Sequence, residues 1–593
     1  MMMDHKKSLY RFRNVNAVLM VVLMACTPHH YHSTAVAFAY TSGMKTRTHT
    51  RRGPRSTTIT SIRSSKNNHT PTPYHAPPPP RQSHSHKDEI TKIPWLIIGG
   101  GIHGVHIAAR LLGSQSGGMD LNLDPDPANS KSKSNLCIVD AHEHLLHTWK
   151  SRTAATGMEY LRSSAGYHLD PDENSLRDQF GSGTAASAGG TGFRKRKKKE
   201  RGNTNTVPAS FSRDYERPRL DVFNQHCDCV IEKYGLENLH TRGVVTAIEP
   251  HKDHVRVVVS LPHDNHDDND NDNDNDNDND NDKHMVYNAE HVVLALGNDD
   301  PSYAEWVDTE DIEQGLVHHL LEDQKTRARN NPNDASDTTT YSVAVVGGGI
   351  TAAHKALELV HDAKATKIHL ISRHPLKEQQ FDTHQDWMMD LAASKRSEEG
   401  GGEGIPKRQR LFSQSACWKE RRRIIGRERV AGTVTPAVNR GASGLKYAIQ
   451  KGDIQWHQAE VLKKCYIDID SQSDQSPSQS RPRMELSLSS GTTIEVDEIL
   501  LATGFGKKLP GGTLLQNDLV EKAGLEVSEF CGFPIVDENL LWHSRIFVAG
   551  ALAELELGPS ARNIAGARLA AERIVRKARS MDPLASQQLK SKC

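Results

Sequence analysis

Short apolar runs that lead into glycine-rich turns occur twice along this chain, and each turn precedes a helical pattern. The first run covers residues 93–98 and leads into the turn at residues 99–104. The second covers residues 341–346 and leads into the turn at residues 347–352. Apolar runs this short, between turn signals, are typical of buried parallel strands. The pattern therefore predicts two strand–turn–helix units of the α/β class.

The glycine spacing in both turns is that of a phosphate-binding loop. The positions with this spacing are Gly99, Gly101 and Gly104 in the first turn and Gly347, Gly349 and Ala352 in the second. Glycine permits the tight turn and lets backbone N–H groups approach a pyrophosphate at the positive end of the following helix. Two such turns predict two dinucleotides, most simply FAD in the first unit and a nicotinamide dinucleotide in the second.

The last residue of the second strand in each unit bears on the choice of nucleotide. Residues 135–140 end in Asp140, whose carboxylate is placed to hold the ribose hydroxyls of an adenosine. Residues 367–373 end instead in Arg373, and a guanidinium can bind a 2′-phosphate with two hydrogen bonds. The second unit is therefore expected to bind NADPH, with an ordinary surface arginine as the alternative.

Two later segments are expected to complete the cofactor sites. Residues 497–505 form a buried strand that ends in small residues including Gly504, which lets backbone pack closely against a cofactor. Residues 558–567 open a helix whose N-terminus is placed to face the flavin and to stabilise its negative charge. Gly558 and Asn563 in this segment are therefore candidate FAD-binding residues.

Polar inserts interrupt the first half of the chain at residues 114–134, 181–208 and 263–283. None has enough apolar residues to offset the cost of ordering the chain, so we expect solvated loops. The expected domains are an FAD-binding domain at 91–312 and 491–577, an inserted NAD(P)-binding domain at 313–490, and a tail at 578–593. We expect an α/β fold with two Rossmann-like domains, three-layer β/β/α for FAD and α/β for NAD(P).

The N-terminal residues have the composition of a targeting leader. Basic residues precede an apolar run at residues 17–26 that is too short to span a bilayer as a stable helix, so no membrane span is expected after leader removal. Residues 1–37 indicate a secretory signal peptide, and residues 38–90 a transit-like disordered leader. The order resembles the bipartite leaders of algae whose plastids have extra membranes, and predicts plastid delivery. A plain secretory signal with a disordered basic tail is the alternative.

Charge and cysteine content narrow the function further. Lys+Arg and Asp+Glu are equal at 74 each, so the net charge gives no general attraction to nucleic acid or membrane, and we expect no nucleic-acid partner. The cysteines include no Cys-x-x-Cys pair, which argues against enzymes that need a redox-active dithiol beside the flavin. No ligand spacing indicates a metal site. The oligomeric state does not follow from the sequence.

The whole arrangement resembles flavoproteins with two dinucleotide-binding domains, and among them most closely the L-ornithine and L-lysine N-monooxygenases and their uncharacterised relatives. The resemblance covers residues 93–577 apart from the inserts. It is carried by both glycine turns, by Trp149 with residues 157–163, and by residues 497–505, which match the family's Asp-x-x-x-Leu-Ala-Thr-Gly-Tyr element with phenylalanine in the last place.

The chain also departs from this family. Ser164 stands where the family usually has proline, and residues 165–170 occupy the place of its aromatic-rich stretch. Gly550 is followed by Ala551, whereas many flavoproteins have Gly-Asp at this point. The resemblance therefore extends to FAD binding better than to the identity of the substrate.

The resemblance implies that NADPH reduces FAD and that the reduced flavin uses molecular oxygen to hydroxylate a small amine such as ornithine or lysine. It makes Arg162, His168 and Asn563 candidates for the surroundings of the flavin, with a purely structural role as the alternative. Catalytic acid and base residues do not follow from spacing. Two other functions fit the same residues: an NAD(P)H:acceptor reductase without oxygen insertion, and a flavin-binding sensor without catalysis.

Overall fold

The computed structural model describes residues 90–113, 135–180, 217–262, 283–298, 300–322, 341–387, 407–415, 417–467 and 483–581. By internal contacts the chain divides into Met1–Ser83 and His84–Cys593, and every described residue belongs to the second unit. The predicted signal peptide, leader, inserts and tail lie outside the described residues, except for Ile90, Lys283 and residues 578–581.

The first sheet is built around β1 (Ile90–Ile98), the apolar run before the first glycine turn. Its main order is β17-β18-β6-β1-β2-β3, and the strands pair in parallel except for β17 with β18. The other strands are β2 (Leu136–Asp140), β3 (His240–Arg242), β6 (His284–Leu294), β17 (Leu541–His543) and β18 (Ile546–Val548). Parallel strands are covered on both faces, which explains why their residues are almost continuously apolar.

An antiparallel hairpin, β4 (Val244–Pro250) and β5 (Val255–Ser260), joins this sheet through the first half of β6. The chain reverses between these two strands at residues 251–254. Asp518 covers the outer edge of β4, where its Oδ2 accepts a hydrogen bond from the Ile248 N–H at 3.0 Å.

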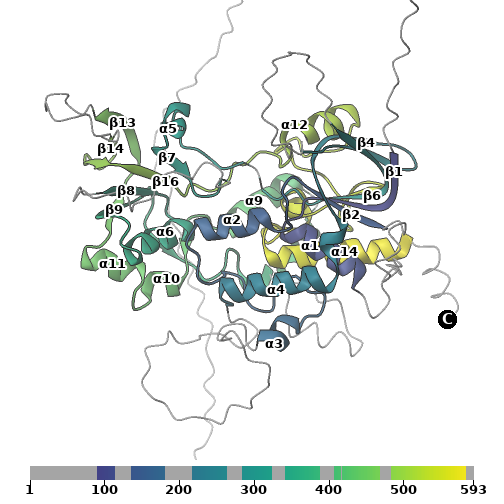
Figure 1. Cartoon of the computed structure of the whole chain (residues 1–593), viewed down its shortest axis with the longest axis horizontal. Helices are drawn as coiled ribbons and strands as arrows, with labels where there is room; N and C mark the ends of the chain where they lie inside the picture. Colours follow the sequence, from purple (N-terminus) through teal and green to yellow (C-terminus); the bar gives the residue numbers. More distant parts are fainter. Residues whose placement is uncertain are drawn as a thin grey trace, which may run out of the picture. The chain divides into compact units, whose positions relative to one another are not determined.

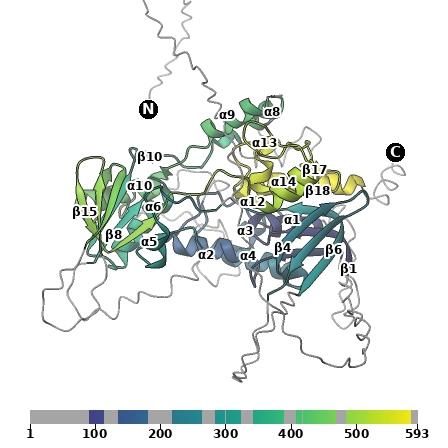
Figure 2. The ribbon, with the colours of Figure 1, turned by 90° about the horizontal axis from the view of Figure 1, so that it is seen from above.

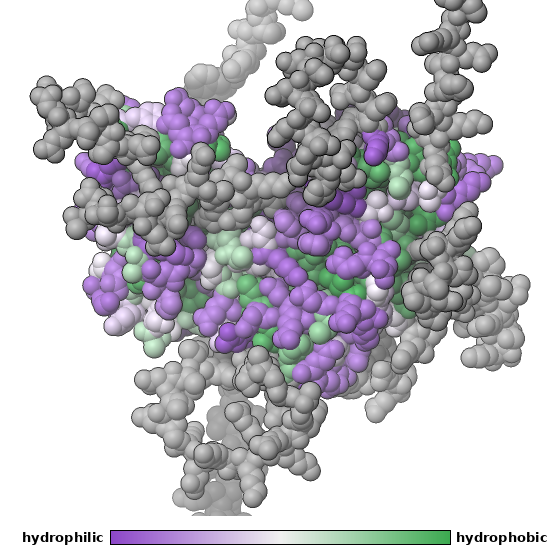
Figure 3. All heavy atoms as spheres, in the orientation of Figure 1, coloured by the Kyte–Doolittle hydropathy of each residue, from purple (hydrophilic) through white to green (hydrophobic). Residues whose placement is uncertain are grey.

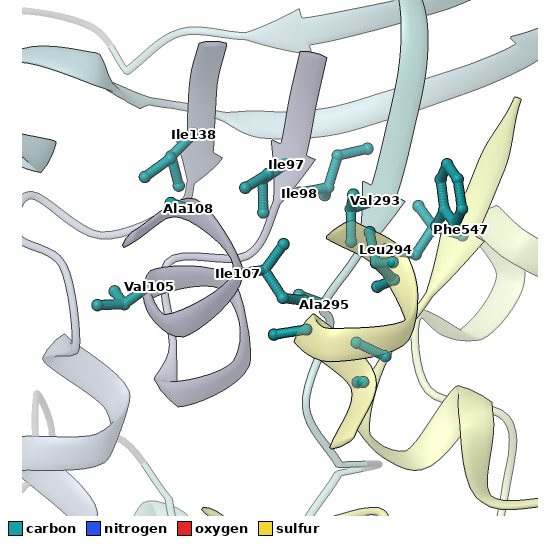
Figure 4. Packing of buried hydrophobic residues seen from close by; sticks show 14 of the residues in the cluster. Ile97, Ile98, Val105, Ile107, Ala108, Ile138, Val293, Leu294, Ala295 and Phe547 are labelled. Atoms are coloured by element: carbon teal, nitrogen blue, oxygen red, sulfur yellow. The ribbon is translucent and has the colours of Figure 1, made fainter. Parts of the chain in front are cut away.

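Helices α1 (Ile102–Leu112) and α14 (Ile564–Met581) pack against each other and contribute to the core of the first sheet. α14 continues to Met581, beyond the predicted domain end at residue 577. Figure 4 shows apolar side chains of the strands and of α1 in this core, among them Ile97, Ile138, Val293, Leu294, Val105, Ile107 and Ala108.

The second sheet is parallel, with the order β12-β9-β8-β16-β7. Its strands are β7 (Val317–His319), β8 (Ser342–Val346), β9 (Lys367–Ser372), β12 (Gln455–Gln458) and β16 (Glu498–Leu501). The helix after its glycine turn is α6 (Ile350–His361). A further antiparallel sheet consists of β13 (Val461–Ile467), β14 (Arg483–Leu488) and β15 (Thr493–Val496). Figure 1 shows strands of these two sheets with α6, α10 (Pro436–Arg440) and α11 (Leu445–Lys451).

The remaining elements connect or cover these sheets. They are α2 (His147–Ala155), α3 (Ser175–Phe180), α4 (Leu220–Lys233), η2 (Leu236–Leu239), α5 (Thr309–Glu313), β10 (Lys377–Glu378), η5 (Gln385–Trp387), α8 (Lys407–Ser413), α9 (Trp418–Glu428), β11 (Thr433–Val434), α10 (Pro436–Arg440), α11 (Leu445–Lys451), α12 (Gly512–Leu515), η6 (Gln516–Lys522), η7 (Gly550–Ala553) and α13 (Glu554–Leu557).

The α/β class with two parallel-sheet units is confirmed, and the second sheet lies in the chain between β6 and β17 of the first. The predicted limits of the inserted domain stay a prediction, and two contacts cross them. Its end at residue 490 falls before β15 and β16, which pair with β14 and β8 of this part. Its start at residue 313 falls after most of α5, although Asp311 of α5 accepts a hydrogen bond from Tyr466 of β13 at 2.6 Å.

On the face that Figure 3 shows, the described residues are mainly hydrophilic, with smaller hydrophobic patches between them. Within the described stretches, no helix combines the length and the apolar character needed to cross a membrane.

Candidate functional site

The first glycine turn is pressed against the end of the neighbouring strand β6. Gly99 has a φ of +110°, and its N–H donates to the Val139 carbonyl at 2.8 Å. A Cβ at Gly99 would lie 2.4 Å from the carbonyl oxygen of Ala295. Only glycine fits at this position, because the backbone has a positive φ and because there is no space for a Cβ.

The other two glycines of this turn have different surroundings. A Cβ at Gly104 would lie 1.8 Å from the Gly99 carbonyl oxygen, so Gly104 lets the first turn of α1 contact the glycine turn. Gly101 is the N-cap of α1, and a Cβ there would meet no atom within 4 Å. α1 has no acidic residue in its first turn and no side-chain cap. Its N-terminal N–H groups are therefore suited to a phosphate.

Asp140 lies where the sequence predicts it, beside the first glycine turn. Its Oδ2 accepts a hydrogen bond from the Gly100 N–H at 2.6 Å, and its Oδ1 accepts one from the His142 N–H at 3.0 Å. Each carboxylate oxygen can accept more than one hydrogen bond, so the group can still bind ribose hydroxyls.

The second glycine turn repeats this construction on the second sheet. Gly347 has a φ of +153°, and its N–H donates to the Ile371 carbonyl at 2.9 Å. A Cβ at Gly347 would lie 2.5 Å from the carbonyl oxygen of Ala502, which follows β16 as Ala295 follows β6. Gly349 is the N-cap of α6, whose first turn also has no acidic residue. Ala352 is buried in the helix.

Arg373 follows β9 at the carboxyl edge of the second sheet. Its side chain is 71% exposed, and its Nη1 lies 3.8 Å from Glu460 Oε1, a pair too exposed to hold the guanidinium firmly. The position and the exposure fit a group that binds a 2′-phosphate.

The predicted FAD residues near the C-terminus have defined structural roles. Gly504, with a φ of +84°, accepts a hydrogen bond from the Ser302 N–H at 2.8 Å where the chain crosses between the sheets. A Cβ at Gly558 would lie 2.7 Å from the ring of Trp387. Asn563 caps α14, because its Oδ1 accepts a hydrogen bond from the Gly566 N–H at 2.9 Å. Their contacts with FAD stay predictions.

Arg162 connects two distant segments of the chain. Its guanidinium donates to the carbonyls of residues 379–381 at 2.9 to 3.2 Å and to Thr433 Oγ1 at 2.7 Å. Its Nη1 also lies 2.7 Å from Asp382 Oδ1. Arg162 thus holds residues 379–382 in place, a role that the sequence did not indicate, and its contact with FAD stays a prediction.

His103 is a buried residue of the first turn of α1 that sequence reasoning missed. A Cβ at Gly550 would lie 3.7 Å from its Nε2, so the ring covers the Gly550–Ala551 step. Burial lowers the pKa of His103 to about 4, against a smaller opposite effect of the Arg562 backbone. The ring is therefore neutral at neutral pH. Its position in the glycine turn was the only sequence signal.

Two buried carboxylates of α13 join that helix to α9. Glu556 binds Arg421 at 2.6 Å and Arg573 at 2.9 Å. Glu554 binds Arg562 at 2.7 Å and also Arg422. Burial by itself would raise the pKa of Glu554. The hydrogen bonds and charges of its two arginines outweigh burial and lower the pKa, so Glu554 stays ionised. Figure 2 shows α9 and α8 beside α13.

His168 lies in a buried polar seam that is bounded by α1, α4 and α14. Its Nε2–H donates to the Glu173 carbonyl at 3.1 Å, and its ring lies 4.9 Å from that of His226. His106 of α1 lies 2.5 Å through Nδ1 from the Leu169 carbonyl. Arg568 of α14 is fully buried and donates to Glu173 Oε1 at 3.2 Å. These contacts hold His168 in the seam, and its place in the surroundings of the flavin stays a prediction.

Burial keeps the histidines of this seam neutral. It lowers the pKa of His106 and His168 well below the usual value, with Arg568 as the next cause. It lowers the pKa of His226 to about 4, where the Asp170 charge acts in the opposite direction and the Lys233 charge in the same direction. Protonation of this seam is therefore unfavourable in the folded state.

A separate surface cavity of about 740 Å³ lies between α2 and α4. Its lining includes Lys150, Asp228 and Glu232 but none of the predicted dinucleotide-binding residues. Among the residues that the structure describes, no group of three or more His, Cys, Asp or Glu side chains could hold a metal ion.

Comparison with solved structures places this fold among known monooxygenases. The FAD-bound cadaverine monooxygenase of desferrioxamine biosynthesis from Erwinia amylovora is 14% identical, with a TM-score of 0.51 and coverage of 82% of this chain and 94% of that chain. The L-lysine 6-monooxygenase from Pseudomonas syringae is 16% identical, with a TM-score of 0.51 and coverage of 83% and 100%. The ornithine hydroxylase from Pseudomonas aeruginosa is 14% identical, with a TM-score of 0.51 and coverage of 82% and 98%.

The chain has the fold of these monooxygenases, which confirms the sequence resemblance at the level of the fold. No protein-family description and no curated protein matches the sequence.

Gly104→Ala should destabilise the protein, because the new Cβ would lie 1.8 Å from the Gly99 carbonyl oxygen. Overpacking of this kind costs about 1–3 kcal/mol. Gly426→Ala, at an exposed helix position with no atom within 4 Å of the new Cβ, is the matched control and should not destabilise. Denaturant unfolding of the two variants measures the difference, and equal stabilities would contradict the packing.

Stability should decrease as the pH falls from about 6.5 toward about 4. The unfolded chain binds protons at its histidines from pH 6.5 downward, whereas the folded pKa of His226 is about 4, so the unfolded state binds more protons in this interval. Each such histidine contributes about 1.4 kcal/mol per pH unit. Unfolding free energies between pH 7.5 and 5 should show a smaller slope for His226→Gln than for the unsubstituted protein.

Proposed function

We propose that this protein is a flavin-dependent oxidoreductase that binds FAD at the Gly99 turn and NADPH at the Gly347 turn. The observation that carries the proposal is the repeated construction of the two turns. In each turn, the first glycine has a positive φ. It lies so close to the carbonyl of an alanine, at the end of the adjacent strand in the sheet, that a Cβ would not fit. Each turn then presents a helix N-terminus without acidic residues.

The residues that would hold FAD are the Gly99, Gly101 and Gly104 turn, Asp140 and the N-terminus of α14 with Asn563. Those for NADPH are Gly347, Gly349, Ala352 and Arg373. FAD, when bound, supplies the redox chemistry. The chain's own residues position the cofactors and exclude water. His103 places a neutral ring beside the first turn. The ion pairs of Glu554 and Glu556 hold α9 against α13.

Within this class, the proposed reaction is hydroxylation of a small amine such as ornithine or lysine with molecular oxygen. The shared fold with three amine or amino-acid monooxygenases supports it. One observation favours a second candidate, an NAD(P)H:acceptor reductase. Residues 165–170, which replace the family's aromatic-rich stretch, include the buried His168 and Asp170, and Asp170 accepts hydrogen bonds from Ser175, Lys233 and Tyr234. This segment therefore has little freedom to recognise ornithine.

Purified protein with added FAD should be yellow and should oxidise NADPH.

Gly101→Ala should weaken FAD binding about tenfold or more without changing the stability of the apoprotein. The new Cβ would meet no protein atom within 4 Å, but it would occupy the space through which the phosphate approaches the backbone. Gly347→Ala should impair NADPH oxidation and leave FAD content unchanged.

The products separate the two candidate reactions. Hydroxylated ornithine or lysine in proportion to the NADPH consumed supports the monooxygenase. Reduction of an added acceptor, with only hydrogen peroxide formed in its absence, supports the reductase. A colourless protein that retains no FAD would contradict both.

Arg373→Ala should narrow the preference for NADPH over NADH by about tenfold, since a charge-assisted hydrogen bond to the 2′-phosphate is lost. Arg440→Ala is the matched control, because Arg440 is similarly exposed at 61% and binds Glu378. The ratio of kcat/KM values for the two nucleotides measures the effect. An unchanged ratio would mean that Arg373 is an ordinary surface arginine that does not bind the 2′-phosphate.

A further inference from the structure

Arg429 differs from the other arginines around α9. It is the C-cap of that helix, it is half-buried, and its backbone N–H donates to the Ile425 carbonyl at 3.0 Å. Arg421, Arg422 and Arg427 each bind a carboxylate. The guanidinium of Arg429, by contrast, has no hydrogen bond or ion pair with any residue in the described part of the chain.

Arg429 lies close to both glycine turns. Gly432, which follows it by three residues and has a φ of +68°, approaches the second turn, where a Cβ at Gly349 would lie 3.5 Å from Gly432 Cα. Arg429 is also near enough to Arg562 for the two charges to interact. Arg562 lies next to His103 of the first turn, and its Nη1 lies 3.3 Å from Asn298 Oδ1. The free guanidinium is thus placed between the two predicted cofactor sites.

The carboxylate charges that act on Arg429 are shared with other arginines. Burial lowers the pKa of Arg429 and the Arg562 charge lowers it further, whereas the charges of Asp382 and Glu554 raise it. Both carboxylates already bind other arginines, Asp382 through Arg162 at 2.7 Å and Glu554 through Arg562 at 2.7 Å. An arginine does not lose its proton in a protein. A half-buried charge without a partner is unfavourable, which points to an anion as the missing partner.

A second cation strengthens the positive potential near the same turn. Arg217 is half-buried, and its Nη1 lies 3.4 Å from Thr435 Oγ1, close to Gly432 in the chain. Burial, then the charges of Arg217 and Arg162, lower the pKa of the buried His354 of α6 to about 4. The charges of Arg162 and Arg217 therefore reach the helix that follows the second turn and add positive potential there.

We propose that Arg429 binds an anionic oxygen group of a small ligand between the two glycine turns. The group is a carboxylate or a phosphate, because these match the planar donor array of a guanidinium. Its source is either the carboxylate of the substrate or a phosphate of the nicotinamide nucleotide. The choice of source rests on the proposed function, but the anion site itself does not.

The test compares Arg429→Met with Arg423→Met, whose arginine lies in the same helix, is 70% exposed and binds Glu420. The full chain is titrated with acetate, inorganic phosphate and NADP⁺, at constant ionic strength, and the melting temperature and the dissociation constant for NADP⁺ are measured. None of these measurements needs turnover. A failure of the proposed redox function therefore leaves the result on the anion site intact.

Arg429→Met should lose about tenfold or more of the affinity for an anion, and Arg423→Met should lose none. Weaker NADP⁺ binding in Arg429→Met identifies the nucleotide phosphate as the ligand group. Unchanged NADP⁺ binding with a lost response to acetate identifies a substrate carboxylate. Arg429→Lys retains a charge and should bind with intermediate affinity, which separates loss of the anion site from misfolding. If Arg429→Met and Arg423→Met respond alike to all three ligands, the proposal is wrong.

Discussion

The contact between the first glycine of each turn and the end of the adjacent strand is the constraint on which both candidate sites depend. Gly99 and Gly347 lie so close to the carbonyls of Ala295 and Ala502 that a methyl group could not be accommodated. This contact fixes where each strand ends and each helix begins. The N-termini of α1 and α6 are then presented at the carboxyl edge of a parallel sheet, where open α/β sheets bind their ligands.

Arginine–carboxylate pairs determine how the segments beyond the sheets are held around these turns. Glu554 and Glu556 are buried, and each accepts hydrogen bonds from two arginines. Removing one partner would leave an unpaired charge in a medium of low dielectric constant. Arg162 binds residues 379–382 in the same way. Because these pairs use the nearby carboxylates, Arg429 has no partner among the residues that the structure describes, and the region has a positive potential suited to anionic ligands.

The seam between α1 and α14 is polar although it is buried. Arg568 and the neutral rings of His106 and His168 lie in it, in contact with carbonyl or carboxylate groups of residues 169–173. Both helices begin at residues predicted to face FAD. The packing of the two helices therefore places buried histidines behind the first site. In the low dielectric of the core, the neutral form of these histidines is favoured.

The sequence by itself determined the two strand–turn–helix units and placed Asp140 and Arg373 at strand ends, because short-range periodicity and glycine spacing decide these features. Only the tertiary structure decided which charged groups are free. Arg162 and Arg429 look alike in the sequence, yet one is fully hydrogen-bonded and the other has no partner in the described chain. The position of β16 likewise depends on pairing with β8, which lies far away in the chain. Such long-range partners leave no local pattern.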